Sequence, residues 1–190
     1  MDDITWIASS KEELKHILSE TDSYYTFMNI KVNKQKSILM TNNTSHITNN
    51  HTTLKFGSEH ITLPNTSKDQ SIRFLDVWFS LQGSQDFNVH KAYQITSSTS
   101  QKLSFKRLTG NHIKYITNQI VIPQLDFLLQ CTVLTKHDYT KVIAPLYQTF
   151  KHKSYLNSTT SNNVIHSQFL YELINFECHH ITNMILSLHK

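Results

Sequence analysis

Glycine and proline are scarce in this chain, with only three of each among 190 residues. These two residues make most of the tight turns that a β-sandwich needs. Asn, Ser, Thr and His must make the turns instead, which suits polar connections between longer elements. The sequence therefore predicts a helix-rich chain of the α+β class, of a size that allows one domain or a domain and a half.

The basic residues outnumber the acidic ones, which gives a formal net charge of +4. Most of them are lysines, since Arg73 and Arg107 are the only arginines. A lysine excess suits a surface that faces phosphates, because counterion release needs only point charges. It suits an ordinary solvated surface equally well, so composition leaves both interpretations open.

The two cysteines, Cys131 and Cys178, lie far apart in apolar, helix-like surroundings. We expect buried, reduced thiols in an intracellular protein, nuclear or cytoplasmic, rather than a disulfide. The acidic start does not resemble a secretory signal peptide. No apolar run is long enough to span a membrane, so we expect no membrane partner.

Residues 1 to 82 are predicted to form a first domain of mixed helix and short antiparallel strands. The apolar run at 4 to 8 predicts a short buried strand, and residues 30 to 40 are also strand-like. The polar, low-complexity residues 41 to 53 predict a surface loop.

A helix is predicted between these strands. Ser9 with Glu12, or Ser10 with Glu13, has the spacing of a capping box, in which each side chain accepts a bond from the other residue's backbone N–H. The helix should end near Asn29. Its apolar stripe comprises Leu14, Ile17, Leu18, Thr21, Tyr25 and Met28.

Two further β elements complete the first domain. Gly57 and Ser58 predict a hairpin turn between residues 54–56 and 60–63. The run from 72 to 81 is apolar on both faces, which predicts a strand covered on both sides.

Residues 83 to 190 are predicted to form a second, all-helical domain. The helical pattern is weak over 87 to 105, where Ser and Thr crowd it, and Thr135 with Asp138 resembles a capped helix start. Pro145 should bend or shorten that helix. A last helix is predicted through 170 to 188. Apolar residues at helical spacing in the middle of the domain are Ile113, Ile116, Ile120, Leu125, Leu128 and Leu129.

The 12 histidines invite a test for a metal site. Cys178, His179 and His180 are adjacent, but they should point to different sides of one helix, and no Cys-x-x-Cys accompanies them. We assign no zinc-finger role. The sequence also lacks a Ser-His-Asp arrangement and a glycine-rich phosphate loop.

Three motifs follow one another in the first domain. The chain begins with Met1-Asp2-Asp3, then Asn33, Lys36 and Ser37 have an Asn-x-x-Lys-Ser pattern after the helix. An apolar hairpin at Phe74 to Leu81 comes third. This order resembles the end of the palm and the thumb of a reverse transcriptase domain from a non-LTR (LINE-type) retrotransposon.

The chain departs from the family's pattern at two positions. Asn29 stands where the family often has Gly at the opening of the Asn-x-x-Lys motif, and Asp76 stands where the primer-supporting strand usually has Gly. The strand before the Asp-Asp pair is missing. We therefore expect the chain to begin inside a larger domain.

The resemblance implies nucleotidyl transfer with two Mg²⁺ ions, an RNA template and a DNA primer. Asp2 and Asp3 would be the metal-binding carboxylates, and Lys36 would approach the incoming triphosphate. The family's upstream aspartate has no counterpart here, so we expect no polymerase activity from this chain alone. Mg²⁺ is expected only if the missing palm is supplied.

Other residues are candidates for contacts with nucleic acid. Trp78, Phe74 and Phe79 would support a primer end, or else pack in the core. A basic set in the helical domain would follow a phosphate backbone, or else form a solvated helix face: Lys102, Lys106, Arg107 and Lys114, with Lys151 and Lys153 further along.

Three functions follow from these observations. The first is an inactive fragment of an RNA-directed DNA polymerase, a palm end followed by a thumb-like segment. The second is a nucleic-acid-binding module without chemistry. The third is a helical interaction protein that pairs through the helix predicted at 168 to 190.

Overall fold

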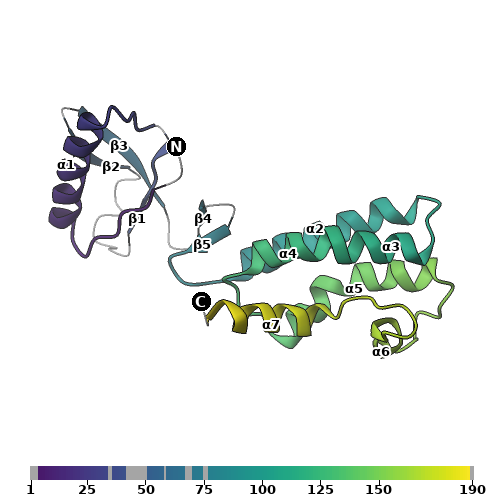
Figure 1. The fold of residues 1–190 in the computed structure, drawn as a ribbon. Coiled ribbons are helices and arrows are strands. Elements are labelled where there is room, and N and C mark those ends of the chain that lie inside the picture. The colour runs from purple at the N-terminus through teal and green to yellow at the C-terminus, as the bar shows by residue number, and fades with distance from the viewer. Residues whose placement is uncertain are drawn as a thin grey trace. The chain divides into compact units, whose positions relative to one another are not determined.

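The chain belongs to the α+β class, with short strands in its first part and helices in its second (Figure 1). The computed structural model describes residues 4–33, 36–41, 51–57, 59–66, 70–74 and 77–188. The chain divides into two compact units. The mixed unit contains Met1–Leu75 and Phe79–Gly83, and the helical unit contains Asp76–Trp78 and Ser84–Lys190.

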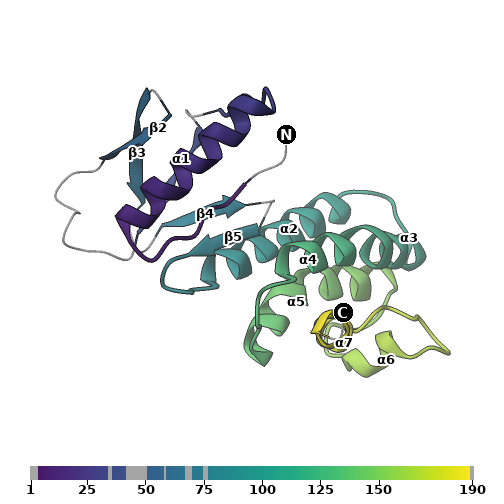
Figure 2. The same cartoon turned by 60° about the vertical axis from the view of Figure 1, so that its left-hand side comes forward.

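The mixed unit packs one helix on a small sheet, and both views show α1 beside the β2–β3 hairpin (Figures 1 and 2). The sheet has the order β1-β3-β2, in which β2 and β3 are antiparallel and β1 is parallel to β3. Its buried core consists of Leu18, Tyr25, Leu54, Phe56 and Leu63. The elements are α1 (Lys11–Phe27), β1 (Leu39–Met40), β2 (His51–Phe56) and β3 (Glu59–Thr66).

Helix α1 has both of the ends predicted for it. The backbone N–H of Glu13 donates to Ser10 Oγ at 3.1 Å, and the N–H of Ser9 donates to Glu13 Oε2 at 2.7 Å. At the other end Asn29 has φ 53°, and the N–H of Ile30 reaches back to the carbonyl of Tyr25 at 2.8 Å. This is a Schellman ending, in which Asn is a common substitute for Gly.

The predicted hairpin is confirmed, since β2 and β3 pair around Gly57 at φ 66°. The positive φ favours glycine at this position, and a Cβ there would also displace the carboxylate of Asp22. Strand β2 begins at His51, so the loop predicted over 41 to 53 was placed too far along the chain; residues 42 to 50 lie outside the described residues.

Two strand predictions in the mixed unit are wrong. Residues 4 to 8 form no strand, and Ile7 is 87% exposed, because no described strand pairs with this segment. Only Trp6 packs inward, with its ring centroid 6.2 Å from that of Phe56. Among the described residues of the stretch from 30 to 40, only those of β1 form a strand.

The single strand predicted over 72 to 81 is two short strands, β4 (Ser71–Phe74) and β5 (Val77–Ser80), which form their own two-stranded sheet. Phe79 is 42% exposed, and Arg73 in β4 is exposed as well. The prediction of a strand covered on both faces is therefore wrong. The apolar run looks continuous in the sequence because β4 and β5 follow each other closely and both contain apolar residues.

The helical unit is built mainly from α2, α4 and α5, with α7 packed on α5 (Figures 1 and 2). Its core includes Ile113, Leu125, Leu129, Leu146 and Phe150, each at most 1% exposed. The elements are α2 (Asp86–Ser104), α3 (Gly110–Ile116), the π-helical turn η3 (Thr117–Val121), α4 (Ile122–Leu129), α5 (Lys136–Lys153), α6 (Asn162–His166) and α7 (Phe176–Leu188).

Helix α2 is a regular helix through the segment whose apolar pattern is weak. Two of its hydroxyl side chains face α5: Thr96 Oγ1 donates to the carbonyl of Val142 at 2.6 Å, and Ser100 Oγ donates to that of Pro145 at 2.9 Å. Small polar side chains therefore replace large apolar ones at this contact. Pro145 does not shorten α5, which continues to Lys153.

The π-helical turn η3 explains one wrong core prediction. The N–H of Ile122 bonds to the carbonyl of Thr117, five residues back, and Pro123 follows at the start of α4. Proline has no N–H and clashes with the carbonyl four residues before it, and a wider turn relieves both problems. The extra residue rotates the following positions, so Ile120 is 54% exposed and Val121 is buried.

The last predicted helix is shorter than expected. Leu170, Leu173 and Ile174 precede α7, which begins only at Phe176. The N–H of Leu173 bonds to the carbonyl of Ile165, so the chain folds back before α7 starts.

The prediction that Cys131 and Cys178 are buried is wrong. Both are exposed free thiols.

Candidate nucleic-acid interface

The residues expected to perform metal chemistry are only partly described. Asp2 and Asp3 lie outside the described residues. Lys36 is exposed and follows a turn in which its N–H bonds to the carbonyl of Asn33 at 3.2 Å. In the part of the chain that is described, no three His, Cys, Asp or Glu residues are grouped so as to hold a metal ion.

Trp78 packs against the start of α2. Its ring centroid lies 4.5 Å from that of Phe87, and its carbonyl accepts a hydrogen bond from Asn88 Nδ2 at 3.0 Å. The ring is partly buried against the core of the helical unit. These contacts fit core packing of Trp78 better than support of a primer end. In the mixed unit, the rings of Phe74 and Phe79 pack on each other, with centroids 6.4 Å apart.

Two basic residues of the predicted set are used inside the protein. Lys114 Nζ lies 3.0 Å from Glu172 Oε2, so its charge is already paired. Lys151 is only 8% exposed, and its Nζ donates to the carbonyl of Ser158 at 3.4 Å. Neither is placed to contact a phosphate backbone freely.

The remaining basic residues gather at one end of the helical unit. Lys102 is in the last turn of α2, and Lys106 and Arg107 are in the loop that follows. Lys153, at the end of α5, donates from Nζ to the carbonyls of Ser104 at 2.9 Å and Lys106 at 2.8 Å. Figure 1 shows the end of α2, the start of α3 and the end of α5 at this same end of the unit. We call Lys102, Lys106, Arg107 and Lys153 the basic end.

The basic end contains no carboxylate. No acidic residue occurs between Asp86 and Asp126, or between Asp138 and Glu172, and these two stretches supply the basic end. Within the described residues, no ion pair involves Lys102, Lys106 or Arg107, all three of which are exposed. The positive charge there faces solvent, and no ion pair in the described part of the chain neutralises it.

Lys153 has a structural role as well as a charge. The carbonyls at the end of a helix lack partners within it and carry the negative end of the helix dipole. The ammonium of Lys153 satisfies one of these carbonyls, that of Ser104, and also binds the loop carbonyl of Lys106. It therefore fixes the loop that carries Lys106 and Arg107. Beside it, a surface depression between α2 and α5 is lined by Ser104, Gln148, Thr149, His152 and Lys153.

Sequence reasoning missed two aromatic residues at this end. Phe105 is 82% exposed and Tyr155 is 99% exposed. The available signal was local: Phe105 directly precedes Lys106 and Arg107, and Tyr155 closely follows Lys153. Aromatic residues among basic ones are typical of surfaces that bind single-stranded nucleic acid.

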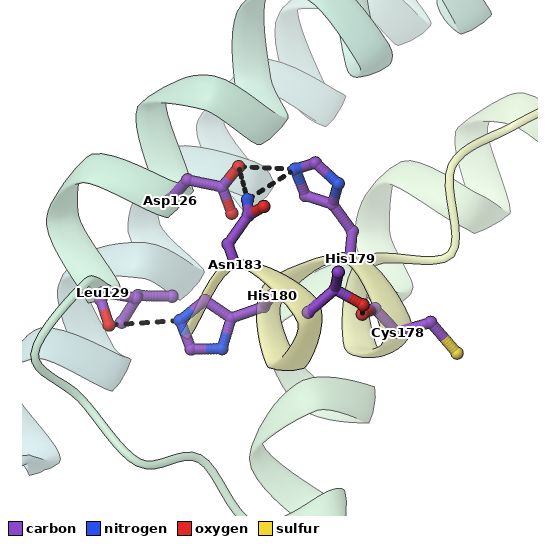
Figure 3. Close-up of polar contacts among 7 residues, drawn as sticks. Asp126, Leu129, Cys178, His179, His180 and Asn183 are labelled. Atoms are coloured by element: carbon purple, nitrogen blue, oxygen red, sulfur yellow. Dashed lines mark hydrogen bonds and ion pairs between the residues drawn. The ribbon is translucent and has the colours of Figure 1, made fainter. Parts of the chain in front are cut away.

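The histidine cluster at the start of α7 holds that helix in place (Figure 3). His179 Nε2 lies 2.7 Å from Asp126 Oδ2, and Asn183 Nδ2 contacts both of these side chains. His180 is buried and donates from Nε2 to the carbonyl of Leu129 at 3.1 Å. Cys178 points to another side of α7, as predicted for these three neighbours. The histidine contacts therefore pack α7 on α4.

His180 has a second partner on α5. The hydroxyl of Tyr139 lies 2.8 Å from His180 Nδ1. Because Nε2 donates, Nδ1 of a neutral ring accepts from this hydroxyl. Burial raises the pKa of Tyr139, which favours the neutral phenol that this bond requires.

No helix in the described residues has both the length and the apolar character needed to cross a membrane. The chain matches no known protein family, no curated protein and no solved structure.

Proposed function

We propose that the helical unit binds nucleic acid through its basic end. The observation that carries the proposal is the charge arrangement. Three exposed cations lie in the last turn of α2 and the loop after it, backed by Lys153 from α5, and none of the three forms an ion pair within the described residues. A nucleic acid backbone presents closely spaced negative charges, and neutralising them releases condensed counterions. An arrangement of this kind binds phosphates without needing base contacts.

The parts of the basic end have different roles in this proposal. Lys102 and Lys106 act as point charges towards phosphate oxygens. Arg107 can bind one phosphate with two parallel N–H donors, because its guanidinium is planar and forked. Lys153 positions the loop, since its ammonium is already bonded to two carbonyls.

The proposal is tested by removing charge from the basic end. We expect Lys102→Gln, Lys106→Gln and Arg107→Gln, combined in one chain, to weaken binding of a labelled RNA–DNA hybrid by about ten-fold or more. Fluorescence anisotropy at about 50 mM salt, where electrostatic binding is strong, measures the affinity.

The matched control removes three charges elsewhere on the same unit. Lys91, Lys136 and Lys141 are exposed lysines of α2 and α5, and their combined change to Gln keeps the same net charge as the test variant. If this control loses as much affinity as the test variant, binding follows net charge alone and the basic end has no special role.

The reverse transcriptase relationship stays a prediction. It rests on Met1-Asp2-Asp3, Asn33, Lys36 and Ser37, and the Asp pair lies outside the described residues. In this wider proposal the mixed unit is the end of a palm, the helical unit is thumb-like, and Mg²⁺ binds only when the upstream palm is present. We expect the purified chain to show no primer extension with Mg²⁺ and dNTPs; template-dependent DNA synthesis would contradict the expected inactivity.

The interaction-protein alternative has support from one element. Helix α7 exposes Ile181, Ile185 and Leu186, at 43%, 52% and 57%. The charged residues of α7 do not indicate which kind of protein would bind this helix. Nucleic-acid binding therefore has the stronger support.

A further inference from the structure

The basic end exposes two large aromatic side chains that contribute no packing to the core. Phe105 follows the last residue of α2, and Tyr155 follows the C-cap of α5. Their exposed fractions are 82% and 99%. Neither ring is paired with another ring among the described residues.

Tyr155 also has an unfavourable backbone conformation for its residue type. Its φ is 57°, in the left-handed region. The N–H of Tyr155 bonds to the carbonyl of His152 at 3.2 Å, and that of Leu156 to the carbonyl of Lys151 at 2.8 Å. These two bonds make a Schellman ending with Tyr at the position that Gly usually occupies. Stability alone gives no reason for a tyrosine there, because its ring packs on nothing.

The two rings belong to segments that are bonded together. Lys153 Nζ binds the carbonyls on both sides of Phe105, those of Ser104 and Lys106. Ser154 lies against Gly110, where a Cβ would meet its side chain, so the residue before Tyr155 touches the start of α3. Phe105 and Tyr155 therefore come from the same small region as the three exposed cations.

We propose that the basic end takes single-stranded RNA or DNA, with unpaired bases stacked on Phe105 and Tyr155 while Lys102, Lys106 and Arg107 contact the phosphates. This inference rests on the proposed function and names its ligand class. Bases in a duplex are stacked on each other and present no free face to a protein ring. Stacking on exposed aromatic residues needs bases that are unpaired, and it tolerates any base because each has a π face.

The test compares a single strand with a duplex. The probes are labelled oligouridine, labelled oligothymidine and a blunt duplex of equal length, each titrated with the full chain by fluorescence anisotropy. We expect Phe105→Ala and Tyr155→Gly each to weaken single-strand binding by about five-fold or more and to leave duplex binding unchanged. Tyr155→Trp, which keeps a stacking ring, should bind as the unaltered chain does.

Tyr155→Gly separates binding from folding. Glycine is the favoured residue at this position of a Schellman ending, so we expect a thermal midpoint equal to or above that of the unaltered chain. A loss of single-strand affinity in this variant then cannot come from unfolding. Phe27→Ala is the control for the loss of an exposed ring, because Phe27 is 86% exposed at the end of α1 in the mixed unit.

The outcomes distinguish the inference from the function on which it rests. If Phe105→Ala and Tyr155→Gly bind single strands as tightly as the unaltered chain, while the triple charge variant does not, phosphate binding stands and stacking is overturned. If the triple charge variant also binds normally, the proposed function is overturned as well. A preference for the duplex over both single strands also overturns stacking. Tighter binding of oligouridine assigns RNA as the ligand, and tighter binding of oligothymidine assigns DNA.

Discussion

Tyr147 is a buried residue whose hydroxyl joins α5 to the segment before α7. The hydroxyl donates to the carbonyl of Ile174 at 3.2 Å and accepts from the N–H of Phe176 at 3.4 Å. Burial raises the pKa of Tyr147 to about 12, against an ordinary value of 10.0. The folded protein therefore holds the phenol proton more tightly than the unfolded chain does.

This pKa shift predicts a loss of stability at high pH. The stabilisation is fully present below pH 10, where Tyr147 is neutral in both states, and it is lost as pH rises towards about 12. At pH 11 the loss relative to pH 9 should be about 1.4 kcal/mol. The contribution of Tyr147 is measured by urea unfolding of the unaltered chain and of Tyr147→Phe at both pH values. The variant should lack this loss of unfolding free energy. Tyr115→Phe, which changes an exposed tyrosine, should show the full pH loss; a Tyr147→Phe variant with that same loss would contradict the account.

Two residues with a left-handed backbone, Asn29 and Tyr155, differ in how well the sequence predicts them. The first helix was predicted to end near Asn29, and asparagine tolerates the left-handed conformation that this residue adopts. Tyr155 has nearly the same φ but carries no such signal, since tyrosine is uncommon there. The candidate stacking residue was therefore not predictable from local preference, and only its basic neighbours pointed to it.

Helix capping was predictable at the scale of elements, because it depends on residues three or four apart. The first predicted box is half formed: Ser10 Oγ accepts from the N–H of Glu13, but the Glu13 carboxylate accepts from the N–H of Ser9 instead of Ser10. The second box, Thr135 with Asp138 on α5, is complete. In the second box Thr135 Oγ1 donates to Asp138 Oδ2 at 2.6 Å and accepts from the Asp138 N–H at 3.2 Å. The bond from the Thr135 hydroxyl, followed by the bond from the Thr135 N–H at 3.0 Å, lowers the pKa of the Asp138 carboxyl.

We expect Thr135→Ala to lower the free energy of unfolding by about 1 kcal/mol near neutral pH. The lowered pKa of Asp138 means that the box stabilises the fold above the unfolded value of 3.8, and that this contribution disappears as pH falls below it. The difference in the free energy of unfolding between the unaltered chain and Thr135→Ala, measured with urea, should therefore become smaller at acid pH. Thr140→Ala, one turn later on an exposed face, is the control, and an equal loss there would argue against a capping effect.

Contacts between elements were less predictable than their ends. The weak apolar pattern of α2 concealed a close contact with α5 made by hydroxyl groups, in which Ser100 Oγ also lies 2.5 Å from Thr149 Oγ1. Likewise, the π-helical turn before Pro123 moved Ile120 outward, and periodicity assumes a regular helix. Both errors come from interactions that a one-dimensional period does not contain.

The α2–α5 contact can be measured with two serine variants. Ser100→Ala removes the bonds to Pro145 and Thr149, whereas Ser98→Ala changes an exposed serine whose hydroxyl bonds only to the carbonyl of Ile95. Both substitutions gain the same helix propensity. We expect Ser100→Ala to be less stable than Ser98→Ala by about 1 kcal/mol in urea unfolding. Equal stabilities would mean that the hydroxyl contacts contribute nothing net.

For the whole molecule, the sequence predicted the class of fold and missed the arrangement of charge. The α+β class followed from the scarcity of glycine and proline together with helical spacing. The basic set, in contrast, was predicted as one group and is divided by the fold. Lys114 is paired and Lys151 is buried, while Lys153 joins Lys106 through its carbonyl. Only tertiary structure could separate available charges from used ones.

The salt dependence of nucleic-acid affinity is the most direct test of this account. Plotted as the logarithm of affinity against the logarithm of salt concentration, each phosphate contact contributes about −0.7 to −0.9 to the slope. The account predicts that changing Lys102, Lys106 and Arg107 to Gln makes the slope shallower by about two to three, while the Lys91, Lys136 and Lys141 control keeps the slope of the unaltered chain. An unchanged slope in the basic-end variant would contradict the central claim that this end contacts phosphates.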